Sequence, residues 1–225
     1  MPPLPDLNPA PFPLVAVGVS LGGLTALREL LGGLPAGFPA ALVVVQHLSP
    51  RYSSQFPLLL QRGTPLAVQW AEPDQPVEAG RVYIAPPDYH VVVTPAGCLA
   101  LHQGPPVAYT RPAVTPLFES VAASYGPHGI GVVLTGGGSD GAAGVKAIKA
   151  AGGRVLVQDP RTALAASMPE SAIRTGSVDF VLPLTYIAPA LITLVMRRGA
   201  DSLFWVPPRP AGGWPAAQPA AMREL

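Results

Sequence analysis

The chain has 225 residues, a formal net charge of +1 at pH 7 and a hydrophobic content of 49%. This length suits one large domain or two small ones with a sizeable core, and the near-neutral charge argues against a nucleic-acid partner. The single cysteine, Cys98, excludes an internal disulfide and is too few for a thiolate metal cage, so we expect a cytoplasmic protein.

Both ends of the chain are rich in proline. Residues 1–13 are predicted to be a Pro-rich tail and residues 199–225 a Pro/Ala-rich tail, because such segments bury too little apolar surface to fold. The N-terminal segment also lacks the basic and apolar regions of a signal peptide. Every apolar run is interrupted before it reaches the length of a membrane span, so we expect no membrane insertion and one domain over residues 14–198.

Strands and helices are expected to alternate within this domain. Residues 14–18 and 41–45 are unbroken apolar runs, typical of strands buried on both faces. The other expected elements, in chain order, are helices at 22–31 and 52–61, a strand at 66–70, hairpin strands within 81–101, a helix at 113–125, a strand at 130–134, a helix at 142–150, strands at 155–157 and 180–182, and a helix at 184–196. This order predicts a three-layer α/β/α fold with a mostly parallel, doubly wound, Rossmann-like sheet and a β-hairpin insertion.

Three predicted strands are followed by side chains that could act together in catalysis. Ser20 follows the first strand, His47 follows the second, and Asp140 follows the strand at 130–134. The carboxyl ends of parallel strands are where such folds bind ligands, and the first strand normally lies between the other two. A serine becomes a nucleophile when a histidine takes its proton and a carboxylate orients that histidine. We therefore expect a catalytic serine, base and acid at one sheet edge.

The turn "VAVGVSLGG" at 15–23 also resembles a dinucleotide-binding loop. That motif requires a glycine where Ser20 stands, and an acidic residue near the end of the second strand, where this chain has Gln46 and His47. We therefore interpret the glycines as allowing a tight turn, and the N–H groups from Leu21 onward as an oxyanion site. The order Ser, His, acid also differs from that of the α/β-hydrolases.

Each candidate has a purely structural alternative. The Gly/Ser turn could be a packing device, His47 a hydrogen-bonded structural residue, and Asp140 the N-cap of the helix that follows it. Their convergence at one sheet edge favours the catalytic interpretation. No role is assigned to the other three histidines, and no metal-binding motif is present, so we expect no metal and no cofactor.

Six segments along residues 14–196 resemble, in order, the catalytic domain of CheB, the chemoreceptor protein-glutamate methylesterase: "VAVGVSLGGLTALRELLGGLP", "VVVQHLSP", "YIAPPDYHV", "GPPVAYTRPAVTPLFESVA", "GVVLTGGGSDGAAGVKAIKAAGG" and "AASMPESAI". The resemblance implies a parallel-sheet α/β/α fold and hydrolysis of glutamate γ-methyl esters on bacterial chemoreceptors, with release of methanol and some deamidation of receptor glutamine. By motif, the catalytic triad falls on Ser20, His47 and Asp140.

The resemblance also suggests supporting residues. Backbone groups of Leu21, Gly22 and Gly137 are expected to hold the oxyanion, and Arg111 and Met168 are candidates for substrate contact. For Arg111, pairing with an internal carboxylate is an equal alternative. Three positions depart from the family pattern: Leu21 follows the nucleophile where a small residue is usual, Gly137 replaces a methionine, and "TRPA" at 110–113 replaces "HRPS".

The segment before Leu14 bears on regulation, and the departures at Leu21 and Gly137 leave alternative functions open. Many members of this family carry an N-terminal receiver domain, whereas a short Pro-rich segment precedes Leu14 here. We therefore expect an open site, or control by a separate response-regulator partner, and methylated chemoreceptor cytoplasmic domains as substrates. One alternative is a receptor-binding module that has lost useful turnover, which Leu21 and Gly137 would permit. Less favoured alternatives are a nucleotide-binding domain and an esterase of unrelated role.

Overall fold

The computed structural model describes residues 12–48 and 55–196. The predicted tails at 1–13 and 199–225 lie outside the described residues, apart from Phe12 and Pro13, and so does the start of the helix expected at 52–61. Phe12 packs against the core of the domain. Among the described residues, no helix is both long and apolar enough to cross a membrane.

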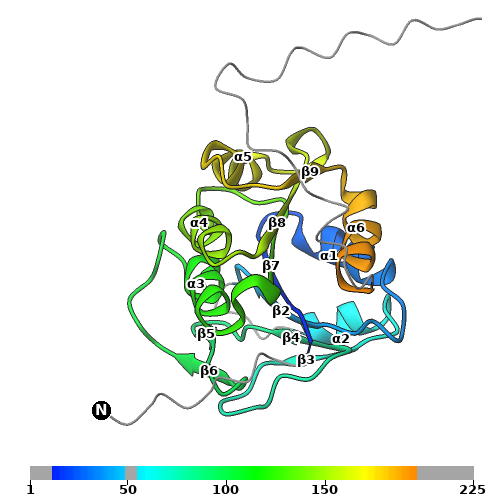
Figure 1. Ribbon diagram of the computed structural model, residues 1–225, viewed down its shortest axis with the longest axis vertical. Coiled ribbons are helices and arrows are strands. Elements are labelled where there is room, and N and C mark those ends of the chain that lie inside the picture. The colour runs from blue at the N-terminus through cyan, green and yellow to red at the C-terminus, as the bar shows by residue number, and fades with distance from the viewer. Residues whose placement is uncertain (1–11, 49–54, 197–225) are drawn as a thin grey trace, which may run out of the picture.

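A seven-stranded sheet forms the centre of the molecule (Figure 1). All of its neighbouring strands pair in parallel. The strand order is β3 (Ala67–Trp70), β4 (Arg81–Ile84), β2 (Ala41–Gln46), β1 (Leu14–Val19), β7 (Gly129–Val133), β8 (Arg154–Gln158) and β9 (Phe180–Leu182). The first strand therefore lies between β2 and β7, so the loops after these three strands start side by side.

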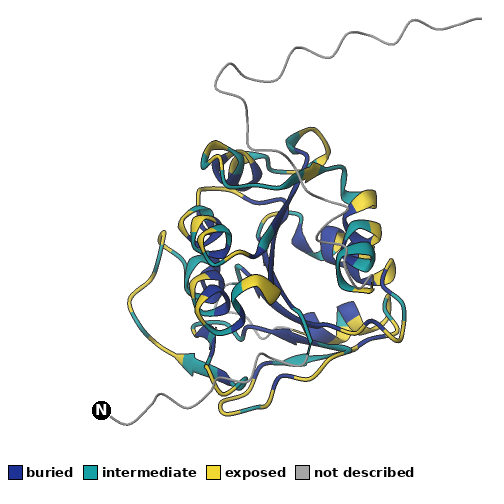
Figure 2. Cartoon of the chain, in the orientation of Figure 1, coloured by how far each residue is buried: buried dark blue, intermediate teal, exposed yellow. Residues whose placement is uncertain are grey.

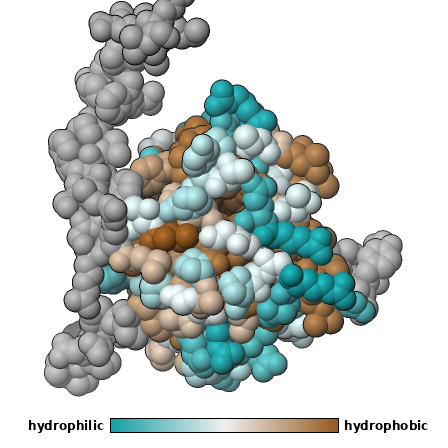
Figure 3. All heavy atoms as spheres, turned by 90° about the vertical axis from the view of Figure 1, so that its right-hand side faces the viewer, coloured by the Kyte–Doolittle hydropathy of each residue, from teal (hydrophilic) through white to brown (hydrophobic). Residues whose placement is uncertain are grey.

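Helices cover both faces of the sheet. The core on one face includes side chains from the helices α3 (Val114–Tyr125), α4 (Ala142–Ala150) and α5 (Ser167–Arg174). The core on the other face includes α1 (Gly23–Gly32), α2 (Phe56–Gln61) and α6 (Leu184–Met196). Figure 2 shows the buried positions along the strands and on the inward sides of the helices. The predicted three-layer α/β/α fold is confirmed, and the outer surface on the α6 side mixes apolar and hydrophilic residues (Figure 3).

The hairpin insertion is present but shorter than predicted. The strands β5 (His90–Val93) and β6 (Leu99–His102) pair antiparallel in a separate two-stranded sheet. The hairpin is fastened to α3, because Ser120 Oγ accepts a hydrogen bond from Val93 N at 3.0 Å. The assignment of residues 81–84 to this hairpin was wrong. Their side chains from Val82 to Ile84 are buried without alternation, and the segment enters the parallel sheet between β3 and β2.

The helix α5 was not predicted from the sequence. Its segment "SMPESAIR" is polar on average, and the side that includes Met168 and Ala172 is buried. Pro169 stands in its first turn, where the missing N–H costs no hydrogen bond. A helix this short is not stable in isolation, so packing against the sheet decides its structure.

Gly18 lies within β1, and not in the turn that its motif suggested. A methyl group on its Cα would lie 2.4 Å from Val114 Cγ1, so only glycine lets the start of α3 approach the strand this closely. We expect Gly18→Ala to lower the free energy of unfolding by about 1–3 kcal/mol through overpacking. Urea unfolding measures this change, and Gly37→Ala is the control because that position has open space around it. Equal stability of the two variants would contradict the close approach.

Candidate active site

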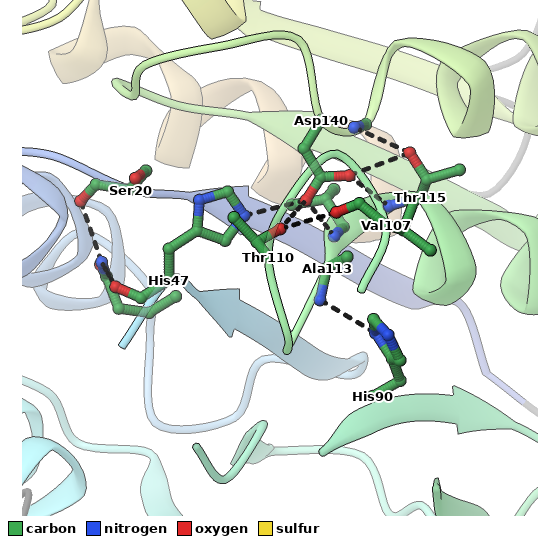
Figure 4. Close-up of polar contacts among 11 residues, drawn as sticks. Ser20, His47, His90, Val107, Thr110, Ala113, Thr115 and Asp140 are labelled. Atoms are coloured by element: carbon green, nitrogen blue, oxygen red, sulfur yellow. Dashed lines mark hydrogen bonds and ion pairs between the residues drawn. The ribbon is translucent and has the colours of Figure 1, made fainter. Parts of the chain in front are cut away.

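The three predicted catalytic residues meet at the carboxyl edge of the sheet. Ser20 follows β1, His47 follows β2, and Asp140 lies in the loop between β7 and α4. The Nε2 atom of His47 lies 2.9 Å from Asp140 Oδ2. Figure 4 shows the imidazole between Ser20 and Asp140, with its other nitrogen on the side of Ser20. Between the described atoms of Ser20 and His47 there is no side-chain hydrogen bond, which is common in sites without substrate.

Asp140 is held in place by the N-terminus of α3. Its carboxylate accepts hydrogen bonds from Val114 N at 2.6 Å, Thr115 N at 3.0 Å and Thr115 Oγ1 at 3.0 Å. These groups are otherwise unpaired at a helix start, where the helix dipole also favours a negative charge. Asp140 therefore does cap a helix, but this helix is α3. The helix that follows it in sequence, α4, begins at Ala142, and its N-cap residue, Gly141, provides no side-chain cap.

The same contacts set the ionisation of Asp140. Burial disfavours its charged form, but the hydrogen bonds from His47 and from the two backbone N–H groups outweigh burial and hold the pKa of this carboxyl below its usual value. Asp140 is therefore a charged, oriented acceptor for His47 at neutral pH. With Nε2–H donating to Asp140, the Nδ1 atom of His47 is left as a proton acceptor.

The turn after β1 exposes backbone donors beside Ser20. Gly22 adopts a φ of 83°, a left-handed conformation that favours glycine. The N–H groups of Leu21, Gly22 and Gly137 donate no hydrogen bond to any described residue. By contrast, the N–H of Gly136 donates to Ala165 O at 2.9 Å. Free N–H groups at the start of α1 suit an oxyanion, because they are aligned with the positive end of the helix dipole.

A cavity of about 400 Å³ opens beside Ser20. Its apolar wall includes Leu21, which is 63% exposed. The lining residues come from the turn after β1, the start of α1, the end of β2 and the start of α2: Ser20, Leu21, Gly22, Gly23, Leu24, Thr25, Gln46, His47 and Phe56. A cavity of this size with one reactive hydroxyl and nearby backbone donors can accept a single small side chain.

Comparison with known proteins identifies the family. The family model described as CheB methylesterase matches residues 15–191. The chain belongs to the CheB methylesterase family. The crystal structure of the Thermotoga maritima CheB methylesterase catalytic domain superposes with a TM-score of 0.80 and 36% sequence identity, covering 83% of this chain and 100% of that one.

This chain matches nearly the full length of some relatives and about half the length of others. It is 39% identical to a Leptospira interrogans relative over 81% of this chain and 95% of that protein. It is 41% identical to the protein-glutamate methylesterase FrzG of Myxococcus xanthus, and there the match covers 83% of this chain and 56% of FrzG. A protein-glutamate methylesterase/protein-glutamine glutaminase of Anaeromyxobacter dehalogenans is 44% identical over 79% of this chain and 52% of its own length. The chain thus spans about half the length of some relatives.

Two expected substrate contacts do not face the cavity of this CheB family member. The guanidinium of Arg111 is engaged internally, with Nη2 2.6 Å from Asp88 Oδ1 and Nη1 2.9 Å from Gly104 O. This arrangement is the internal pairing that was the alternative for Arg111. Met168 is completely buried, in the space that a side chain at Gly136 would otherwise fill. Met168 therefore packs beneath the loop and is not among the residues that line this cavity.

The segment "TRPA", which departs from the family pattern, still reaches the acid. Thr110 Oγ1 donates to Val107 O at 3.0 Å and lies 3.5 Å from Asp140 Oδ2. The longer distance makes this a weak contact compared with those from α3. The sequence did not indicate that Thr115 holds Asp140 in place. Its hydroxyl also accepts a hydrogen bond from Gly141 N at 3.0 Å. Thr115 is the second residue of α3 and lies far from Asp140 in the chain, so no local pattern in the sequence indicates this role.

His90 supports the same helix start, although the sequence suggested no role for it. It is 1% exposed. Its Nδ1 accepts a hydrogen bond from Ala113 N at 3.2 Å, and its Nε2 lies 3.1 Å from Pro105 O. A neutral ring with hydrogen on Nε2 satisfies both contacts. Burial, the largest effect, lowers the pKa of His90 below its ordinary value.

This shift predicts a loss of stability in mild acid. The unfolded chain takes up a proton at this histidine near pH 6.5, whereas folded His90 resists protonation, so its stabilising contribution is present above about pH 6.5 and declines as the pH falls. We expect His90→Asn to weaken this pH dependence, because asparagine does not titrate in this range. Asparagine can still accept a hydrogen bond from Ala113 N, so the helix start should be kept. Urea unfolding at several pH values between about 5.5 and 7.5 measures it. An unchanged slope in the variant would show that other groups cause the loss.

Proposed function

We propose that this chain hydrolyses glutamate γ-methyl esters on the cytoplasmic domains of bacterial chemoreceptors, releasing methanol, and that it deamidates receptor glutamine at the same site. The proposal rests on the family, on the names of its relatives, and above all on one observation. His47 is paired with a buried, charged Asp140 beside Ser20, at the mouth of a cavity of side-chain size. Such a protein acts in the cytoplasm, where receptor signalling domains lie.

The reaction begins with attack of Ser20 Oγ on the ester carbonyl carbon. His47 takes the hydroxyl proton at Nδ1 as the new C–O bond forms. Negative charge that develops on the carbonyl oxygen is stabilised by the free N–H groups of Leu21 and Gly22, with Gly137 on the opposite loop. Collapse of the tetrahedral intermediate breaks the bond to the methoxy oxygen, which leaves as methanol with the proton from His47.

Water then completes the cycle. It attacks the acyl-enzyme, gives its proton to His47, and releases glutamate and the Ser20 hydroxyl. Throughout, Asp140 keeps the imidazole in one orientation and stabilises its positive charge. The same steps convert glutamine to glutamate, with ammonia as the leaving group in place of methanol.

Methanol release from methylated receptor fragments tests this function. The fragments are incubated with the chain, methanol is measured by gas chromatography, and mass spectrometry locates the residues that lose a methyl group. Unmethylated fragments of the same sequence are the control. Methanol equal to the number of new glutamates supports the proposal. Binding to the fragments without methanol release would instead favour the receptor-binding module.

A partner can be tested in the same assay. Addition of a separate, phosphorylated response regulator would raise the rate of methanol release if such a protein controls this site. The isolated chain should show no response to a small phosphate donor. Stimulation of the isolated chain by the donor would contradict control by a separate protein.

A further inference from the structure

Gln46 connects the nucleophile and the base through their main chains. It is the last residue of β2, is 6% exposed, and is adjacent to His47. Its Nε2 donates one hydrogen bond to Ser20 O at 2.9 Å and a second to His47 O at 3.1 Å. We propose that Gln46 is a positioning residue, whose carboxamide sets the separation of Ser20 and His47. This inference rests on the proposed function, because it concerns the same site.

The ladder between β1 and β2 ends where this connection begins. The last backbone hydrogen bond between the two segments runs from His47 N to Val19 O at 3.2 Å. Beyond it, Ser20 and His47 have no direct side-chain hydrogen bond between their described atoms. The carboxamide of Gln46 therefore adds one further connection just past the ladder. Small errors in the relative position of reacting groups lower rates strongly, so this connection bears on catalysis.

The carboxamide oxygen of Gln46 indicates that stability alone does not explain why a glutamine occupies this position. Gln46 Oε1 is buried and has no hydrogen-bond partner among the described residues. A buried acceptor without a donor destabilises a fold, and an apolar side chain of the same length would avoid that cost. The glutamine that ends β8 differs in this respect. Gln158 Oε1 accepts from Thr135 N at 2.9 Å, and its Nε2 donates to Thr162 O at 3.0 Å.

A glycine on α1 makes room for this side chain. A methyl group on Gly23 would lie 1.8 Å from Gln46 Oε1 and 3.0 Å from Val19 Cγ2. Gly23 has no left-handed φ that would require glycine. The absence of a side chain at position 23 is therefore explained by the space that Gln46 occupies. Gly23→Ala displaces the carboxamide without altering a catalytic side chain.

A double-mutant cycle with Gln46→Ala and Gly23→Ala tests the proposal. We expect each single variant to lower kcat by about 10- to 100-fold, with KM changed by less than about twofold, because the reacting groups are misplaced while the cavity remains. In the Gln46→Ala background, Gly23→Ala should cost little further activity, since there is no carboxamide to displace. Losses that multiply in the double variant would overturn the proposal.

A comparison of Gln46→Met with Gln158→Met distinguishes a role of Gln46 in positioning the reacting groups from a role in the stability of the fold. Gln46→Met removes the unpaired acceptor but also the donor to Ser20 O, which keeps Gly23 N, and to His47 O. Its melting temperature should therefore stay close to that of the wild type while kcat falls. Gln158→Met should melt at a lower temperature, because it leaves Thr135 N unpaired. A Gln46→Met protein with wild-type kcat would overturn the positioning role.

Ser20→Ala in the same assay distinguishes failure of the serine mechanism from failure of the positioning role. If Ser20→Ala retains activity, the proposed serine mechanism fails. If Ser20→Ala is inactive while both Gln46 variants turn over at the wild-type rate, the positioning role alone fails.

Discussion

Replacing Ser20 with alanine is expected to reduce methyl ester hydrolysis to the background rate, a loss on the order of a million-fold. Without the hydroxyl, no acyl-enzyme forms, and His47 and the backbone donors have no nucleophile to activate. The fold should be unaffected. Ser20 makes its hydrogen bonds in the described structure through main-chain atoms, to Thr135 O, Gly23 N and Gln46 Nε2. Its stability should therefore stay within about 0.5 kcal/mol of wild type.

The measurement is kcat/KM for methanol release, together with the melting temperature. Ser139→Ala is the matched control, because Ser139 lies in the loop after β7, next to Asp140, and is exposed. We expect it to turn over at the wild-type rate. Full activity of Ser20→Ala would show that the nucleophile is wrongly assigned, and loss of activity only in Ser139→Ala would move the assignment to that residue.

Asp140→Asn is expected to damage both catalysis and the fold. The amide favours the wrong tautomer of the base, an effect worth about 10⁴-fold in kcat in serine hydrolases of this type. Both carboxylate oxygens of Asp140 accept hydrogen bonds from the start of α3. In asparagine one of these oxygens is replaced by an NH₂ group, which cannot accept. Hydrogen bonds at Val114 N or at Thr115 would therefore be lost, at a cost of about 1–3 kcal/mol.

The pH dependence of this variant supplies a second readout. Because the pKa of folded Asp140 is held below its unfolded value, its stabilisation is fully present above about pH 4 and is lost as the pH falls through the folded pKa. Asp140→Asn should lack that part of the acid transition. Urea unfolding from neutral to acidic pH measures it, alongside kcat at neutral pH.

Asp179→Asn serves as the control for Asp140→Asn. Asp179 accepts from Val155 N at 2.7 Å and from Lys149 Nζ at 2.6 Å, so it has a comparable structural role. It lies just before β9, away from the three strand ends that form the site. This variant should lose stability and keep kcat. If both variants lose only stability, Asp140 is a helix cap without a part in the reaction.

Much of the architecture can be predicted from the sequence. Unbroken apolar runs such as 14–18 and 41–45 indicate strands buried on both faces, and their alternation with helices leads to a parallel sheet. Once that sheet is expected, the residues directly after its strands are brought to one edge by the chain order alone. Ser20, His47 and Asp140 are candidates for this reason, before any contact between them is known.

Other features depend on contacts between distant segments. The sequence predicts strands within 81–101 as hairpins, and only packing shows that residues 81–84 join the main sheet. The cap of α3 by Asp140, the burial of Met168 and the pairing of Arg111 with Asp88 each join residues more than twenty positions apart, or a loop with the core beneath it. Local periodicity contains no information on such pairs.

The sequence by itself determined the layers of the fold and the residues placed at the strand ends, because both follow from the order and the apolar character of short segments. Only the tertiary structure decided what holds those residues in position: the start of α3 around Asp140, and the carboxamide of Gln46 over Gly23. The physical reason is that hydrogen-bond partners and close approaches are set by how separate elements pack, and packing is a property of the whole domain.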